Sequence, residues 1–135
     1  MEELSGGQKQ LLNLASVMAM QPKVLVLDEP TSQLDPIAAS EFLATIRKIN
    51  LELGTTVIII EHRLEEVFPM ADKVLVLEEG RQILYDEPRQ VGKALAGNDL
   101  FLAMPSPVQI YDGTGQVGTC PLTVCEGEKL AEGTF

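Results

Sequence analysis

Two long stretches of the chain have apolar residues spaced for one face of a helix. The first, over about residues 7–20, follows Ser5 and Gln8, whose separation is that of a capping box. The second, over residues 37–53, follows Asp35, a residue type that caps helix N-termini. The pattern therefore predicts two amphipathic helices, with shorter helices over residues 64–70 and 89–96.

Apolar runs of strand length separate these helices. The uninterrupted runs Val24–Leu27 and Thr55–Ile60 are typical of strands buried on both faces of a parallel sheet. Lys73–Leu77 predicts a third strand, and the turn dipeptide Glu79-Gly80 leads into a partner strand over Arg81–Tyr85. Strands that alternate with helices at short spacing indicate an α/β architecture with a parallel sheet.

The pattern decays beyond Gly97. Residues 98–135 contain many Gly and Thr residues and the segment Pro105-Ser106-Pro107, without a sustained period. We therefore interpret residues 1–97 as one module and residues 98–135 as a linker or tail.

Composition and charge narrow the class of protein. The 135 residues carry a formal net charge of -10, and 45% of them are hydrophobic, as in ordinary globular proteins. The acidic excess extends over both halves of the chain, which disfavours nucleic acid as a partner. No apolar run approaches the length that spans a bilayer, and the acidic start MEELSGGQKQ is unlike a signal peptide. We expect a soluble intracellular chain in which Cys120 and Cys125 are free thiols.

Asp28 and Glu29 directly follow the first predicted strand. Ligands of open α/β sheets bind at the carboxyl ends of the strands, and phosphoryl transfer requires acids there. One carboxylate can hold Mg²⁺ against the phosphates while its neighbour orients or deprotonates the attacking water, which favours Asp28 for the metal and Glu29 for the base. The alternative is a pair of acids that only cap a helix after a core strand.

The segment Leu4–Gln8 opens a helix with two glycines. Backbone N–H groups and the Ser5 hydroxyl could approach an anion there, where the helix N-terminus supplies partial positive charge. A flexible Gly-Gly entry to the helix is the alternative. His62 follows the second predicted strand, so a parallel sheet would bring its imidazole towards the edge that carries Asp28 and Glu29. It could otherwise be an ordinary polar residue at a strand end.

Taken together and in this order, these motifs resemble the ATP-binding cassette (ABC) ATPases of transporters. LSGGQ matches the signature of that family, VLVLDEP its Walker B segment, Ser32-Gln33-Leu34-Asp35 its D-loop and His62 its switch histidine. The continuation EHRLEEVFPMADKVLVLEEGR, followed by AMPSPVQIY and CPLTVCEGEKL, is similar to the energy-coupling-factor branch. In that branch some chains carry two ATPase modules, and residues 98–135 resemble the segment that joins them.

The resemblance implies a P-loop NTPase-type parallel sheet, with ATP and Mg²⁺ as cofactors. It implies that Asp28 positions Mg²⁺, that Glu29 is the general base, and that His62 contacts the γ-phosphate and the attacking water. A second ABC ATPase module is expected to pair head to tail with this one, so that the signature closes over the phosphate loop of its partner. The residues expected at that closed interface are Ser5, Gly6, Gly7, Gln8 and Asp35.

The chain departs from the family in lacking the phosphate loop, the adenine-stacking aromatic residue and the Q-loop glutamine, all of which precede the signature in that family. No segment of it fits the phosphate loop G-x-x-x-x-G-K-[ST], so we expect the C-terminal part of a module, without the phosphate-loop strand. We expect the isolated chain to be inactive, and either to be poorly folded or to aggregate through open sheet edges. The function implied is part of an ATPase that powers micronutrient uptake at the inner face of the cell membrane through membrane transporter subunits. The alternatives are a non-enzymatic module that lends its signature face to a complete ATPase, and a non-transport ABC protein.

Overall fold

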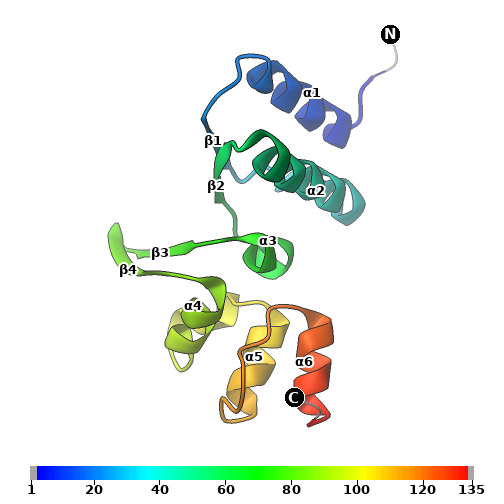
Figure 1. Ribbon diagram of the computed structural model, residues 1–135. Coiled ribbons are helices and arrows are strands. Elements are labelled where there is room, and N and C mark those ends of the chain that lie inside the picture. Colours follow the sequence, from blue (N-terminus) through cyan, green and yellow to red (C-terminus); the bar gives the residue numbers. More distant parts are fainter. Residues whose placement is uncertain (1–2, 134–135) are drawn as a thin grey trace. The chain divides into compact units, whose positions relative to one another are not determined.

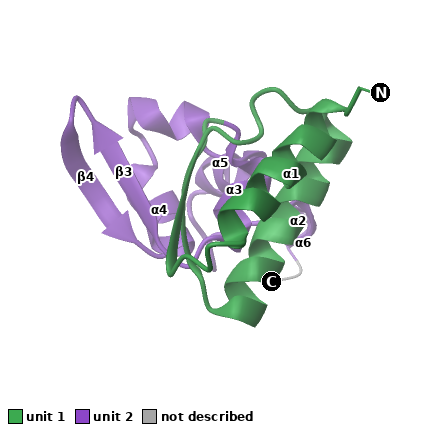
Figure 2. Ribbon diagram, turned by 90° about the horizontal axis from the view of Figure 1, so that it is seen from above, with its two compact units in different colours: residues 1–62 green, residues 63–135 purple. Residues whose placement is uncertain are grey.

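The computed structural model describes residues 3–133 and forms two compact units, residues 1–62 and residues 63–135 (Figure 2). The expected ranges 1–97 and 98–135 include residues 1–2 and residues 134–135. These four residues lie outside the described part of the chain. Each unit has its own hydrophobic core.

The first unit alternates helices and strands, as the sequence predicts (Figure 1). Its elements in order are α1 (Gly6–Met18), β1 (Val24–Asp28), α2 (Pro36–Leu53) and β2 (Thr56–Ile60). The two strands pair in parallel, with Val24 opposite Thr56 and Asp28 opposite Ile60. This α/β arrangement with a small parallel sheet confirms the predicted fold class, and it places the carboxyl ends of β1 and β2 at one edge.

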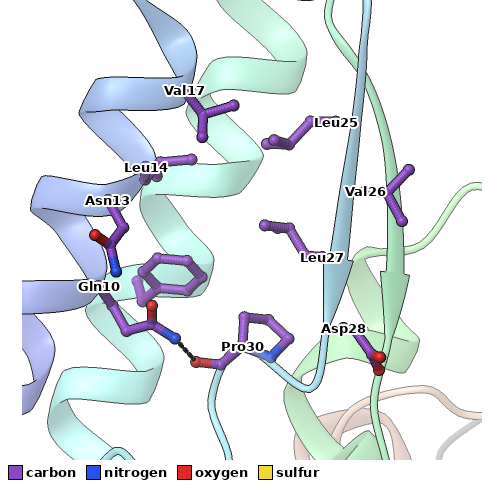
Figure 3. Close-up of a pocket in the computed structure, with 10 residues that line it drawn as sticks. Gln10, Asn13, Leu14, Val17, Leu25, Val26, Leu27, Asp28 and Pro30 are labelled. Atoms are coloured by element: carbon purple, nitrogen blue, oxygen red, sulfur yellow. Dashed lines mark hydrogen bonds between the residues drawn. The ribbon is translucent and has the colours of Figure 1, made fainter.

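Only one face of the β1–β2 sheet is covered. Leu25 points towards α1 and α2 and is buried with Leu14 and Phe42, whereas Val26 points to the other side of the strand (Figure 3). The uncovered face consists of four apolar side chains that are 48–61% exposed: Val24, Val26, Ile58 and Ile60. The prediction of burial on both faces is therefore wrong for the described residues. An unbroken apolar run supplies side chains to both faces, but α1 and α2 cover one of them.

The second unit begins with a helix and a hairpin. Its helix α3 (Leu64–Met70) is followed by β3 (Val74–Glu78) and β4 (Arg81–Asp86), which pair antiparallel. The turn between the strands has positive φ at Glu79 (49°) and Gly80 (75°), the conformation that the dipeptide predicts. The predicted hairpin is confirmed. The helix α4 (Pro88–Leu95) follows it.

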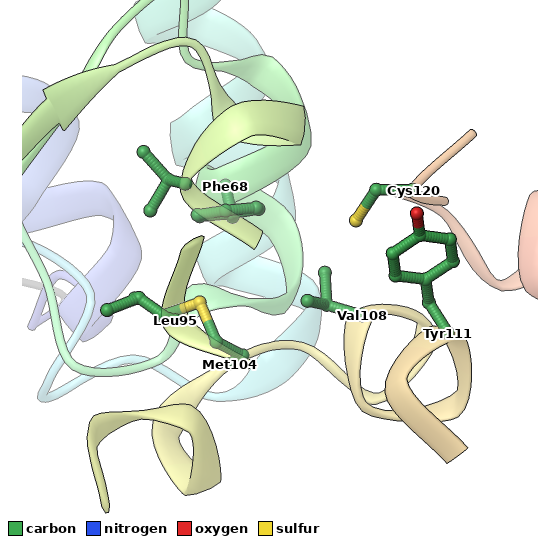
Figure 4. Packing of buried hydrophobic residues seen from close by; sticks show 7 residues of the cluster. Phe68, Leu95, Met104, Val108, Tyr111 and Cys120 are labelled. Atoms are coloured by element: carbon green, nitrogen blue, oxygen red, sulfur yellow. The ribbon is translucent and has the colours of Figure 1, made fainter. Parts of the chain in front are cut away.

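Residues beyond Gly97 are more ordered than their sequence pattern predicts. They form the 3₁₀ helix η1 (Asp99–Ala103) and the helices α5 (Ser106–Gly113) and α6 (Val124–Ala131). These elements share one core with α3 and α4, made by Phe68, Val91, Leu95, Met104, Val108, Tyr111 and Cys120 (Figure 4). The sequence pattern did not predict these elements, because Gly, Thr and Pro residues interrupt residues 98–135 and leave no sustained period. Whether residues 98–135 correspond to a segment between modules stays a prediction.

Candidate functional site

Glu29 and His62 meet at the carboxyl edge of the β1–β2 sheet. The Glu29 backbone N–H donates to the carbonyl oxygen of Ile60 at 2.8 Å, which extends the strand pairing by one step. The Glu29 Oε1 atom lies 2.8 Å from the His62 Nε2 atom. The predicted approach of the imidazole to this edge is therefore present in the structure, as a contact with Glu29.

Both side chains of this pair are accessible to a ligand. The Glu29 side chain is 44% exposed and that of His62 is 80% exposed, so solvent screens their attraction and the pair contributes little to stability. Glu29 also has a φ of 45°, a left-handed conformation that costs a non-glycine residue about 1–2 kcal/mol. Strained residues are concentrated at functional sites, where the surrounding structure holds them in place.

Asp28 is the last residue of β1 and is exposed. Carboxylate oxygens suit Mg²⁺, which proteins commonly hold with one or two carboxylates while substrate phosphates and water complete its shell. Within residues 3–133 no group of three or more His, Cys, Asp or Glu residues is arranged to hold a metal ion. The exposed Asp28 carboxylate can supply one such ligand.

The signature residues form a capped helix start. The Gln8 backbone N–H donates to the Ser5 Oγ atom at 3.2 Å, and the Ser5 backbone N–H donates to the Gln8 Oε1 atom at 2.9 Å. The predicted capping box is confirmed. A Cβ on Gly7 would lie 3.1 Å from the Cβ of Ala38, so the glycine allows α1 to approach α2 closely. A Cβ on Gly6 would lie 3.7 Å from the carbonyl oxygen of Gln33.

Asp35 caps α2. Its Oδ1 atom accepts hydrogen bonds from the backbone N–H groups of Ile37 and Ala38, both at 3.0 Å. Its carboxylate is exposed. The structure thus gives Asp35 a local role that the sequence predicts, while a role at an interface between modules stays a prediction.

The structure reveals two contacts at this edge that sequence reasoning missed. Glu61 accepts hydrogen bonds from the backbone N–H and the hydroxyl of Thr31, and Gln10 donates from its Nε2 atom to the carbonyl oxygen of Pro30 at 2.7 Å. Both contacts fasten the segment after β1. The position of Glu61 directly before His62 indicated that it lies near the site. Its partner Thr31 is 30 residues away in the chain, so the sequence did not indicate the contact.

A pocket of about 230 Å³ lies between α1, β1 and α2 (Figure 3). Its lining is mainly apolar and includes Leu14, Val17, Leu25 and Leu27. Asp28 is the one predicted site residue among those that line it. The pocket therefore does not coincide with the Glu29–His62 pair.

The described part of the chain, residues 3–133, contains no helix that is both long enough and apolar enough to cross a membrane. The family model for ABC transporters matches residues 1–32, the segment that contains the signature and the acid pair.

Similar proteins carry transporter names. An ABC transporter ATP-binding protein of Bacillus cereus is 58% identical over 88 residues, which cover 65% of this chain and 16% of the relative. The energy-coupling factor transporter ATP-binding protein EcfA1 of Caldanaerobacter subterraneus subsp. tengcongensis is 50% identical over 90 residues, which cover 67% of this chain and 32% of the relative.

A solved structure is also similar. That of cbiO1 from Clostridium perfringens, described as part of the ABC transporter complex cbiONQ, matches 74% of this chain with a TM-score of 0.61 and 38% identity. The match covers 42% of the cbiO1 chain, so this sequence spans less than half the length of that protein, as it does of the two relatives. The motifs, the fold and these similarities agree: the chain belongs to the ABC transporter ATP-binding proteins, of which it represents a part.

Proposed function

We propose that the chain is part of an ATP-hydrolysing subunit of an ABC transporter and that it supplies the catalytic edge of one ATPase module. The observation that carries this proposal is the 2.8 Å contact between Glu29 and His62 at the carboxyl edge of β1 and β2. A carboxylate, an imidazole and the neighbouring carboxylate of Asp28 are the groups that water attack on a phosphate needs.

Each group has a distinct task in this proposal. The Glu29 carboxylate orients the attacking water and accepts its proton. The His62 imidazole donates a hydrogen bond to an oxygen of the γ-phosphate. The Asp28 carboxylate holds Mg²⁺, which neutralises phosphate charge when it is bound. Because Glu29 and His62 are both exposed, water and phosphate can reach them without a rearrangement of the core.

The start of α1 serves a second module in the same proposal. The N-terminus of α1 carries partial positive charge, and the backbone there is accessible at Ser5 and Gly6. The capping box fixes this end of the helix, so its amides are already oriented when a phosphate arrives. The signature would therefore stabilise the γ-phosphate held by the phosphate loop of its partner.

Membrane transporter subunits are the further partners that we propose, and a micronutrient is the proposed cargo. Two similarities support the transporter partners. One relative is named an energy-coupling factor transporter protein, and the similar solved structure is described as part of an ABC transporter complex. Attachment through those subunits would place the chain at the cytoplasmic face of the membrane.

The experiment supplies the missing phosphate loop by fusing the segment that precedes the signature in the EcfA1 relative to residues 1–135. We expect the fusion to hydrolyse ATP. Ser5→Arg should lower turnover at least about tenfold, because the bulky cation occupies the space of the phosphate. Ser16→Arg, an exposed change on the same helix, is the matched control and should have no effect. Equal turnover of the fusion and its Ser5→Arg variant would contradict the proposal.

A second candidate function is a non-enzymatic module that lends its signature to a complete ATPase. It is favoured by the presence of a preformed signature helix in a sequence that contains no phosphate-loop motif. Mixing the unfused chain with an intact module whose own signature has been disabled would test it. Hydrolysis that is restored by the chain but not by its Ser5→Arg variant supports lending, and unrestored hydrolysis eliminates it.

A further inference from the structure

Thr31 and Glu61 join the segments that follow the two parallel strands. Thr31 is 3% exposed. Its backbone N–H donates to the Glu61 Oε1 atom at 3.0 Å, and its hydroxyl donates to the same oxygen at 2.5 Å. Hydrogen bonds to an ionised carboxylate are stronger than neutral ones, and these two come from a single buried residue. Glu61 therefore holds Thr31 at two points.

Thr31 is also the centre of the turn that leads from Glu29 to Asp35. The Ser32 N–H donates to the carbonyl oxygen of Glu29 at 3.2 Å, and the Leu34 N–H donates to that of Thr31 at 3.1 Å. Whatever fixes Thr31 therefore fixes the backbone on both sides of it. One of these sides contains Glu29 in its left-handed conformation.

Three consecutive residues at the end of β2 contact this turn. The Ile60 carbonyl accepts from the Glu29 N–H, Glu61 accepts from Thr31, and His62 contacts the Glu29 carboxylate. Of these three contacts, the one made by Glu61 has the most buried partner, Thr31. The Glu29–His62 pair, in contrast, faces solvent. Because the attraction between Glu29 and His62 is weak, the distance between their side chains depends on how firmly the backbone that carries them is held.

We propose that Glu61 is a positioning residue: by holding Thr31, it keeps the Glu29 carboxylate within reach of the His62 imidazole. This inference rests on the proposed function, because it assigns Glu61 to the same catalytic edge. The hydrogen bonds of Glu61 go to Thr31, and the proposed function assigns it no contact with the phosphate. Its loss should therefore separate Glu29 from His62 rather than remove a reacting group.

The single histidine of the chain provides a selective probe in the full 135-residue protein. The measured quantity is the rate at which diethyl pyrocarbonate modifies His62. In the wild-type chain, Glu29→Gln should change this rate about threefold or more, because the variant removes the negative charge beside the Nε2 atom. In the Glu61→Met chain, which lacks the oxygen that accepts from Thr31, the added Glu29→Gln change should alter the rate less than about 1.5-fold, because the two groups no longer meet.

Matched variants separate positioning from stability. Thr31→Ser keeps both donors and should preserve the effect of Glu29→Gln, whereas Thr31→Val removes the hydroxyl and should weaken that effect. Glu52→Gln, an exposed change in α2, is the control and should leave it intact. If Glu61→Met fails to fold by circular dichroism, the comparison of Thr31→Ser with Thr31→Val decides. An undiminished effect of Glu29→Gln in the folded Glu61→Met chain, or in the Thr31→Val chain, overturns the proposal.

The modification requires no ATP, so its outcome is independent of the proposed function. In the fused module, Glu61→Met should lower kcat about tenfold and leave the KM for ATP unchanged, since the proposal gives Glu61 no contact with the nucleotide. A fusion that hydrolyses ATP with an unchanged kcat in the Glu61→Met variant would refute positioning and leave the ATPase assignment standing. A fusion without any hydrolysis would refute the ATPase assignment, while the histidine probe would still decide the role of Glu61.

Discussion

At the scale of single residues, the ion pair at the site in the first unit and an ion pair between two helices in the second unit have different roles. The Glu29–His62 pair is exposed and available for chemistry, whereas Arg89 and Glu126 form a two-pronged pair that ties α4 to α6. The Arg89 Nη2 atom lies 2.9 Å from the Glu126 Oε1 atom, and the Leu122 N–H donates to the Glu126 Oε2 atom at 2.8 Å. This second pair is structural.

The Arg89–Glu126 pair makes the stability of residues 63–133 sensitive to acid. The hydrogen bond from Arg89 lowers the pKa of Glu126, aided by the N–H of Leu122, although partial burial acts in the opposite direction. A carboxyl whose pKa is lower in the folded than in the unfolded state stabilises the fold above its unfolded pKa. That contribution is lost as the pH falls through the folded value.

We therefore predict that the melting temperature falls below about pH 5 and that Glu126→Gln flattens this dependence. Thermal melts between neutral and acidic pH measure it. Glu128→Gln, an exposed change on the same helix, should keep the wild-type slope. Parallel pH profiles for wild type and Glu126→Gln would show that the pair has no such effect.

The site residues differ in how far sequence alone could predict them. The Ser5–Gln8 box and the Asp35 cap are local in the chain, so spacing predicts them. The meeting of Glu29 and His62 follows from the parallel pairing of two recognisable strands. The Thr31–Glu61 contact was not predicted, because it depends on how the turn after β1 folds back on the end of β2.

At the scale of elements, the packing of α4 against α5 depends on a glycine. A Cβ on Gly92 would lie 2.8 Å from the Cys120 Sγ atom and 3.1 Å from a methyl carbon of Val108. Both neighbours are fully buried, so neither can move aside without disturbing the core of residues 63–133.

Gly92→Ala should destabilise the protein by about 1–3 kcal/mol, in spite of the higher helix propensity of alanine. Gly113→Ala is the matched control, because nothing lies within 4 Å of a Cβ at that position. It should leave stability unchanged or raise it by up to about 1 kcal/mol. Chemical denaturation of the two variants measures the difference. If Gly92→Ala proved as stable as Gly113→Ala, the close packing described for α4 would be incorrect.

Elements also differ in predictability. The helix α2 has a cap at each end and a long apolar stripe, and its predicted range differs from the observed one by a single residue. The elements after Gly97 have no such stripe. Prolines lie at the start of α5. The core residues Tyr111 and Cys120 lie near a helix end and in a loop, so they do not follow a helical pattern of apolar residues that could be recognised in the sequence.

At the scale of the whole molecule, each unit leaves one apolar sheet face uncovered. In the first unit, Val26 and Ile58 are neighbours on that face and are 61% and 51% exposed. In the second unit, Leu75 and Tyr85 are opposite each other and are 51% and 59% exposed. Contiguous apolar surface of this kind favours association.

We therefore predict that the isolated chain self-associates. Light scattering at increasing concentration should show species larger than 14.7 kDa. The double change Val26→Thr and Ile58→Thr should reduce association, because threonine keeps the β-branch of a strand residue and adds a hydroxyl to the exposed face. Met20→Thr, at an apolar residue that is 74% exposed outside the sheet, is the control. A wild-type chain that stays monomeric would contradict the prediction.

The most direct test of the catalytic edge is ATP turnover by the fused module with Glu29 replaced by Gln. We predict that Glu29→Gln abolishes turnover and leaves ATP binding intact, because it removes the proton acceptor but keeps Asp28 for the metal. Glu41→Gln, an exposed change in α2, should behave as wild type. Turnover of the Glu29→Gln fusion at the wild-type rate would exclude Glu29 as the general base.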